Sequence, residues 1–182
     1  MALTHYPVIN KNGETIASAV TNLDLHDISR LSRTYGVRAF YVITPLADQK
    51  ILIERIVSHW VKGVGAAYNP KRREALELIR IRNSIRDVEE DIGGREGQAA
   101  KTVATCARHS DDCMSFSRLR AQLKTGAPHL LIFGTAWGLA QEVLDTADYV
   151  LEPLMGVTPY NHLSVRAAAA IILDRLTDKE RQ

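Results

Sequence analysis

Short apolar runs rich in β-branched and aromatic residues recur along the chain and predict buried strands. They occupy residues 4–9, 15–20, 37–44, 78–83, 101–107, 128–134 and 148–154. Segments with apolar positions at helical spacing follow most of them, at residues 25–35, 46–61, 84–92, 115–126, 139–147 and 163–176. Because strands that alternate with helices are joined by crossovers, the pattern predicts an α/β fold. We expect a mostly parallel sheet with helices on both faces.

Capping and turn residues mark several boundaries of these elements. Asn22 or Asp24 is expected to cap the first helix, and Gly36 is expected to end it. Lys11, Asn12 and Gly13 form a predicted turn, and residues 93–98 are predicted to be the most flexible loop tip. The sequence contains no internal repeat and no linker, so residues 1–182 are interpreted as one domain.

Composition narrows the class of protein. Hydrophobic residues make up 46% of the 182 residues and charged residues 24%, which is ordinary for a soluble globular chain. No apolar run reaches the roughly 18 residues of a membrane helix, and the N-terminus lacks a signal-peptide pattern, so a cytoplasmic protein is expected. The two cysteines are too few and wrongly spaced for a zinc site, and no metal site is predicted. A net charge of +2 does not by itself indicate a nucleic-acid-binding protein.

The candidate chemistry lies near the C-terminus, in the stretch LLIFGTAWGL at residues 130–139 and the loops after it. Ligands of open α/β sheets bind at the carboxyl ends of strands. Glycine lets another backbone or a flat ring approach closely, because it has no Cβ. An apolar slot with fixed backbone groups suits a purine. No GxxxxGK[ST] or GxGxxG pattern supports a P-loop or a dinucleotide-binding site.

Three motifs carry a resemblance to a known family. LLIFGTAWGL, YVLEPL and YNHLSVRAAAAIIL occur in the order typical of the SPOUT superfamily of methyltransferases, and NLDLHDISRLSRTYGV resembles the superfamily's first motif. The opening HYPVINKNGE is similar to that of a small bacterial branch of RNA methyltransferases likened to tRNA (guanine-N1) methyltransferases. The resemblance extends from about Ala19 to Leu173 and implies a C-terminal deep trefoil knot, in which the last helix threads through a preceding loop.

The resemblance also implies a cofactor, S-adenosylmethionine, held by the knot loops. Its adenine would lie among backbone groups, which supply both donors and acceptors. The implied cofactor-binding residues are Phe133, Gly134, Thr135, Trp137, Gly138, Leu139, Leu151, Glu152, Leu154, Tyr160, Asn161, Leu163 and Ser164.

Three residues are candidates for catalysis. Arg30 stands six residues before Gly36, the interval of the superfamily's arginine, and its guanidinium can orient a nucleotide through its phosphate or ribose. The competing interpretation is a surface arginine, and Arg33 is a possible substitute. Asn161 and His162 begin the third loop, where an imidazole can accept a proton near neutral pH. Loop stabilisation is an equally ordinary role for both.

Other residues near the site leave alternatives open. Trp137 either stacks on a ring or plugs the core beneath the knot. Glu152 either accepts a bond from the ribose or makes a local loop bond, and Ser164 can simply cap the last helix. Arg166 is either a substrate contact or a solvated side chain.

Two functions follow from this interpretation. The preferred one is an S-adenosylmethionine-dependent RNA methyltransferase that modifies a base or ribose of tRNA or rRNA. The alternative is a non-catalytic module that binds an adenosyl ligand or RNA. The resemblance further implies a homodimer through the knot region, and the apolar face of residues 167–172 fits either such an interface or simple burial. The lack of a long apolar run predicts no association with membranes.

Overall fold

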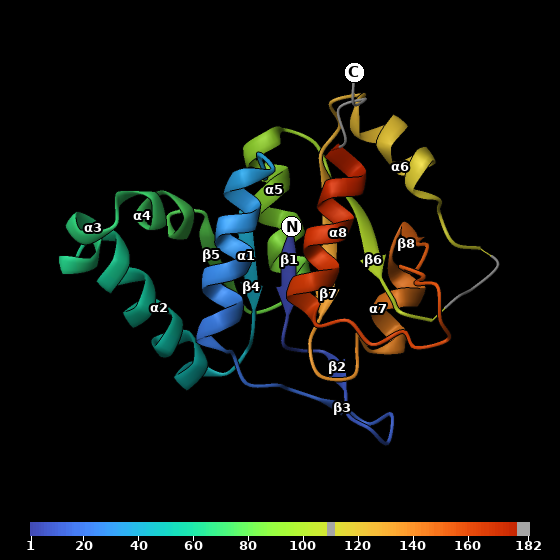
Figure 1. Ribbon diagram of the computed structural model, residues 1–182, viewed down its shortest axis with the longest axis horizontal. Helices are drawn as coiled ribbons and strands as arrows, with labels where there is room; N and C mark the ends of the chain where they lie inside the picture. Colours follow the sequence, from blue (N-terminus) through green and yellow to red (C-terminus); the bar gives the residue numbers. More distant parts are fainter. Residues whose placement is uncertain (109–111, 178–182) are drawn as a thin grey trace.

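The computed structural model describes residues 1–108 and 112–177. Within these residues the strands are Ala2–Thr4 (β1), Val8–Ile9 (β2), Thr15–Ile16 (β3), Phe40–Ile43 (β4), Ile79–Arg82 (β5), Lys101–Thr105 (β6), His129–Gly134 (β7) and Tyr149–Leu151 (β8). The main sheet has six strands in the order β5-β4-β1-β7-β6-β8, and all of its pairings are parallel (Figure 1). Strands β2 and β3 form a separate antiparallel hairpin.

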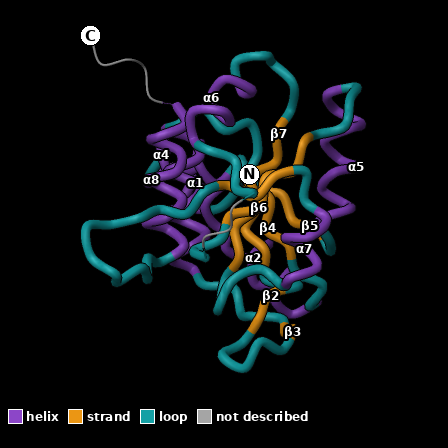
Figure 2. The backbone as a smooth tube through the Cα atoms, turned by 90° about the vertical axis from the view of Figure 1, so that its right-hand side faces the viewer, coloured by secondary structure: helices purple, strands orange, loops and turns teal. Residues whose placement is uncertain are grey.

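Helices cover both faces of the main sheet, as the sequence predicts. They are Asn22–Thr34 (α1), Ala47–Val61 (α2), Val64–Tyr68 (α3), Pro70–Leu76 (α4), Ile85–Glu96 (α5), Phe116–Leu123 (α6), Gln141–Thr146 (α7) and Val165–Thr177 (α8). Helices α1 and α8 lie on one face, and α5 and α7 lie on the other (Figure 2).

Alternation along the strands divides the core between these faces. In β4, Phe40 and Val42 belong to the core cluster that also contains residues of α1, α6 and α8, whereas Tyr41 and Ile43 belong to the cluster that contains residues of α5 and α7. Successive side chains of a strand point to opposite faces, and a strand buried on both faces is apolar throughout. The near-continuous apolar runs of β4 and β7 therefore follow from helices on both sides.

Strand β8 is enclosed on both of its edges, and this enclosure decides the path of the C-terminal chain. One edge pairs with β6. At the other edge, Met114 N donates to Val150 O (2.7 Å) and Glu152 N donates to Met114 O (2.9 Å). Because residues 106–113 connect β6 to Met114, the chain that leaves β8 passes between the two ends of that connection. It then reaches α8, which packs against α1, α6 and β7. The predicted α/β knot fold is confirmed.

Three local expectations are wrong. The segment at residues 4–9 is not one strand, because Pro7 has no backbone N–H to donate to a sheet, and β1 lies earlier in the chain. Thr21 rather than Asn22 or Asp24 caps α1, and its hydroxyl accepts from Asp24 N. Helix α5 continues through the predicted loop tip at Gly93 and Gly94 and ends at Gly97, whose φ is +70°.

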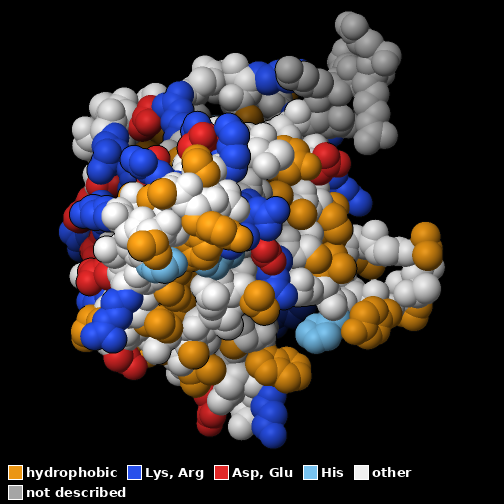
Figure 3. Space-filling view, turned by 60° about the vertical axis from the view of Figure 1, so that its left-hand side comes forward, with side chains coloured by type: hydrophobic (Ala, Val, Ile, Leu, Met, Phe, Trp, Pro, Cys, Tyr) orange, Lys and Arg blue, Asp and Glu red, His pale blue; other side chains and the backbone are white. Residues whose placement is uncertain are grey.

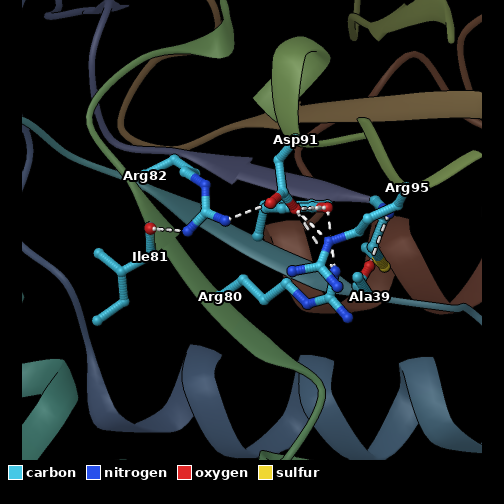
Figure 4. A network of polar contacts seen from close by, with 8 residues as sticks. Ala39, Arg80, Ile81, Arg82, Asp91 and Arg95 are labelled. Carbon is cyan, nitrogen blue, oxygen red and sulfur yellow. Dashed lines mark hydrogen bonds and ion pairs between the residues drawn. The ribbon is translucent and has the colours of Figure 1, made fainter. Parts of the chain in front are cut away.

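An ion-pair network joins β5 to α5 (Figure 4). Arg82 Nη2 lies 2.6 Å from Asp91 Oδ1, while Arg95 Nε (3.0 Å) and Arg80 Nη1 (3.5 Å) approach Asp91 Oδ2. The Tyr41 hydroxyl also donates to Asp91 Oδ2 (2.6 Å). Burial disfavours the charged carboxylate, but the donors from Tyr41, Arg95 and Arg82 outweigh it and hold the pKa of Asp91 well below its usual range.

Replacing Asp91 with asparagine should lower the free energy of unfolding by about 2 kcal/mol at neutral pH, because three guanidinium groups lose their carboxylate. The folded-state pKa lies below the unfolded value of 3.8, so the contribution is fully present above that value and is lost as the pH falls further. Urea unfolding at pH 7 and pH 3 measures both effects. The deficit of Asp91→Asn should be smaller at pH 3.

The exposed neighbour Glu90, which pairs with Arg86 on the same helix, provides the matched control. Glu90→Gln should change stability by less than about 0.5 kcal/mol. Equal deficits for the two variants, or a deficit of Asp91→Asn that does not depend on pH, would contradict a stabilising role for the network.

Candidate active site

The loop that follows β7 turns sharply back on itself. A Cβ at Gly134 would lie 2.6 Å from the backbone N of Leu139, so glycine is required for this close approach. Ala136 and Gly138 both have positive φ, at 52° and 110°. Trp137 stands out from the turn with 67% of its surface exposed, so it does not plug the core.

The β2–β3 hairpin holds this turn in place. Ile9 N donates to Gly138 O (3.0 Å) and Trp137 N donates to Ile9 O (3.1 Å). Within the turn, Gly138 N donates to Thr135 O (2.9 Å). These backbone donors are therefore occupied by the protein itself, which makes the turn a rigid wall of the site.

Polar side chains beneath the turn tie it to β1. Thr135 Oγ1 donates to Thr4 O (3.0 Å) and lies 2.5 Å from Ser18 Oγ, and Ser18 Oγ lies 3.0 Å from His5 Nδ1. His5 is fully buried, and burial lowers the pKa of its imidazole to about 4. A neutral His5 therefore takes part in the network throughout the physiological pH range.

The chain between β8 and α8 forms the second wall and leaves its backbone groups free. Leu151 is buried at the end of β8, and Glu152 Oε1 accepts from Phe116 N (2.6 Å) at the start of α6. Glu152 thus binds a distant helix rather than its own loop. Across the described residues, the N–H groups of residues 154–158 donate to no other protein group. Leu154 packs against the core.

The third predicted loop, which leads into α8, is largely exposed. Tyr160 and Leu163 expose 73% and 46% of their surfaces, and the rings of Tyr160 and His162 meet edge-on with centroids 6.3 Å apart. Asn161 Nδ2 donates to Ala107 O (2.9 Å), which joins this loop to the chain after β6. Ser164 Oγ accepts from Ala167 N (3.2 Å) and caps α8.

Arg166 links the third motif to the first. Its guanidinium lies 3.2 Å from Asp24 Oδ1 and 3.6 Å from Asp27 Oδ2. Asp27 in turn lies 3.9 Å from Arg30, whose side chain is 61% exposed. No hydrogen bond or ion pair of the described residues joins Arg30 to Asn161 or His162. The structure therefore brings Arg30 to the start of α8 through Asp27 and Arg166.

Sequence reasoning missed two features of the site. The Asp24–Arg166 pair spans 142 positions, and the contact between Ser18 and Thr135 spans 117. Neither contact can be predicted from the spacing of residues in the sequence. The aspartates at positions 24 and 27 lie one helical turn apart, and this regular spacing was the only hint of a shared cationic partner.

A cavity of about 260 Å³ adjoins the hairpin and the start of α7, next to the turn after β7 but lined by none of the predicted site residues. It is lined by Ile9, Gly13, Thr15, Arg108, Ala140, Gln141 and Glu142. The residues predicted to bind the cofactor instead lie in the turn after β7, at the end of β8 and in the exposed loop before α8. Its candidate ligand groups are backbone amides and carbonyls, which suits an adenosyl group and would not suit a bare metal ion.

The sequence of this chain matches the family described as SAM-dependent RNA methyltransferase over residues 1–178. The chain belongs to that family. The predicted family of RNA methyltransferases is thereby confirmed, together with S-adenosylmethionine as the cofactor of the family.

Related sequences support the same assignment. A protein of Nitratidesulfovibrio vulgaris named tRNA (guanine-N(1)-)-methyltransferase is 49% identical over 96% of this chain, and one of the same name from Oleidesulfovibrio alaskensis is 45% identical over 96%. This chain spans only 41% of the length of each. A protein of Aquifex aeolicus is 39% identical over the whole chain and 89% of its own length.

Solved structures share the fold. The SpoU methyltransferase AviRb of Streptomyces viridochromogenes in complex with AdoMet has a TM-score of 0.58 at 19% identity, covering 97% of this chain and 58% of its own. The TrmH/SpoU tRNA modifying enzyme of A. aeolicus has a TM-score of 0.56 at 18% identity, covering 97% of this chain and 73% of its own. In the described part of the present chain, no helix is long and apolar enough to cross a membrane.

Gly134→Ala should weaken S-adenosylmethionine binding at least tenfold, because the new Cβ would displace the backbone at Leu139. Overpacking of this kind also costs about 1–3 kcal/mol of stability. Isothermal titration calorimetry measures the affinity. Gly94→Ala in α5, where a Cβ meets nothing within 4 Å, is the control and should bind the cofactor like the wild type. Unchanged cofactor affinity in a folded Gly134→Ala protein would show that the turn is not part of the cofactor site.

Proposed function

We propose that this chain is a single catalytic domain that transfers the methyl group of S-adenosylmethionine to RNA. The observation that carries the proposal is that the backbone N–H groups of residues 154–158, in the chain that follows β8, donate to no other group of the described residues. The free amides of residues 154–158 are donors that the acceptor nitrogens of an adenine edge can match, while the closed turn fixes the shape of the pocket.

The proposed cofactor site has three parts. The turn contributes Phe133, Gly134, Thr135, Trp137, Gly138 and Leu139, the end of β8 contributes Leu151, Glu152 and Leu154, and the third loop contributes Tyr160, Asn161, Leu163 and Ser164. The side chain of Glu152 is bonded to α6 and that of Ser164 to α8, so we propose that these two side chains hold the loops in place rather than contact the ligand.

Bound S-adenosylmethionine supplies an electrophilic methyl group, and the protein positions the acceptor atom in line with it. Arg30 is proposed to hold the nucleotide through phosphate or ribose oxygens, because its exposed guanidinium is only loosely paired with Asp27. His162 is exposed and is the proposed acceptor of the proton released by the nucleotide. Asn161 is assigned to fixing the loop through its bond to Ala107 O.

The relatives from N. vulgaris and O. alaskensis share a name that favours a guanine of tRNA as the acceptor. A tRNA substrate in turn favours the cytoplasm as the place of action. Incubation of the purified protein with labelled S-adenosylmethionine and total tRNA, followed by digestion to nucleosides, tests this directly. Methylguanosine is the expected product. Cofactor binding without methylation of any RNA would instead favour the non-catalytic alternative.

Arg30→Ala should reduce methyl transfer about 100-fold or more while cofactor affinity stays within about twofold, because positioning of the acceptor contributes several kcal/mol to catalysis. Single-turnover transfer and calorimetry separate the two. Arg33→Ala, on the same helix and paired with Glu74 at 3.7 Å, is the control and should retain activity. Full activity of Arg30→Ala would show that Arg30 is not a catalytic residue. Loss of methyl transfer in Arg33→Ala alone would show that Arg33 has this role instead.

A homodimer through the knot region is part of the proposal. Met155, Val157, Tyr160 and Leu163 expose between 46% and 104% of their surfaces in one loop, and contiguous exposed apolar side chains are typical of interfaces. The buried face of α8, which includes Ala169, Ile172 and Leu173, is occupied within the chain, so the loop rather than that face is assigned to the partner.

Sedimentation velocity should therefore give a mass about twice the 20.2 kDa of one chain. Val157→Asp should shift the protein toward the monomer, because a carboxylate would be buried without a partner. Ile51→Asp on α2, at a residue 49% exposed, controls for the added charge and should remain dimeric. A monomeric wild type would contradict the dimer without affecting the cofactor site.

A further inference from the structure

A cluster of aromatic and basic side chains lies between α1, α2 and α4, outside the site described above. The guanidinium carbon of Arg72 stands 4.6 Å from the ring centroid of Trp60. The rings of His26 and His59 meet Trp60 edge-on, with centroids 5.4 and 5.2 Å away. A Cβ at Gly65 would lie 2.8 Å from the Trp60 ring, so α3 packs directly against it. We call these four side chains, His26, His59, Trp60 and Arg72, the Trp60 surface.

Arg72 differs from the basic residues beside it. Lys71 pairs with Glu74 and Arg73 with Glu77, whereas no ion pair of the described residues includes Arg72. Its Nε is buried without an acceptor. A guanidinium that is held flat by an aromatic ring and lacks an acid is ready to bind an oxyanion with its planar donors.

His26 provides a second unsatisfied donor or acceptor at the same place. Its Nδ1 is buried and has no partner among the described residues. Burial lowers the pKa of His26, and the charges of Arg72 and Arg30 lower it further, against the opposing effect of Asp27. His26 and Arg30 lie four residues apart on α1 and therefore share one face of that helix, which places the Trp60 surface beside the candidate catalytic arginine.

Exposed side chains extend this surface. Tyr68 and Val64 on α3 expose 86% and 79% of their surfaces. Figure 3 turns this side of the molecule forward and shows basic side chains interspersed with hydrophobic ones around imidazole rings. Proteins that bind single-stranded nucleic acid combine cationic side chains, which bind phosphates, with aromatic rings, which stack on bases.

We propose that the Trp60 surface binds the phosphate backbone of the RNA substrate next to the nucleotide held by Arg30. The inference rests on the proposed function and assigns a substrate-binding surface to it. Arg72 contacts a phosphate, and Tyr68 offers a ring to a neighbouring base. Helices α2, α3 and α4, which connect β4 to β5 in the sequence, thereby act as the RNA-binding part of the catalytic domain.

The test compares Arg72→Gln with Arg118→Gln. Arg118 lies on α6 and likewise takes part in no ion pair of the described residues, so both variants lose the same charge. Fluorescence anisotropy with labelled tRNA gives the affinity at several salt concentrations. Arg72→Gln should weaken binding about tenfold and reduce the slope of log K against log salt by about 0.7 to 0.9, the value for one lost phosphate contact. Arg118→Gln should change neither.

Two further measurements keep the outcome interpretable. Arg72→Lys retains the charge without the planar fork and should recover the salt slope but only part of the affinity. Calorimetry with S-adenosylmethionine should give wild-type affinity for every variant, which shows that the fold is intact. If the wild type binds tRNA and Arg72→Gln binds it equally tightly, the Trp60 surface is not the binding surface, and the proposed function stands. If the wild type neither binds nor methylates RNA, the proposed function fails and this inference fails with it.

Discussion

The enclosure of β8 on both edges is the constraint on which the site depends. A strand at the edge of a sheet normally exposes one row of backbone groups. Here Met114 occupies that row, so the chain after Glu152 leaves β8 between β6 and Met114 and then reaches α8, which packs against α1, α6 and β7. The position of α8, of the loop before it and of Arg166 all follow from this path.

The proposed site draws on two segments with opposite properties. The turn after β7 uses its backbone donors within the protein, through bonds to the β2–β3 hairpin and to Thr4, and is rigid. The segment after β8 leaves its donors free and presents exposed apolar side chains. In the proposed site, specificity would reside in main-chain geometry, and methyl transfer requires mainly that the acceptor atom be positioned in line with the methyl group.

The sequence predicts the sheet and most helices because their apolar periodicity is strong, as in residues 46–61 and 128–134. It fails where a non-local contact decides the local structure. Thr21 becomes the cap of α1, while the Asp24 carboxylate also binds Arg166 from the far end of the chain. Gly93 and Gly94 stay helical although glycine disfavours helices, since Ile85, Val88 and Ile92 of α5 anchor that helix to the core.

The same limit applies to the site. The glycine turn can be located from the sequence because Gly134 and Gly138 meet needs of the local backbone. Its attachment to Ser18 and its cover by the hairpin have no such local signal, since contacts across more than a hundred residues leave no periodic pattern. The cation–π stack of Arg72 on Trp60 is hidden for the same reason: the two lie on different helices joined by α3.

A crystal structure of the protein with bound S-adenosylmethionine tests the central claim most directly. The adenosyl group should lie between the turn at residues 134–139 and residues 154–158, with hydrogen bonds to the amides of the latter segment. Cofactor density in the cavity beside Ile9 and Gln141, or anywhere else away from these two segments, would contradict the claim.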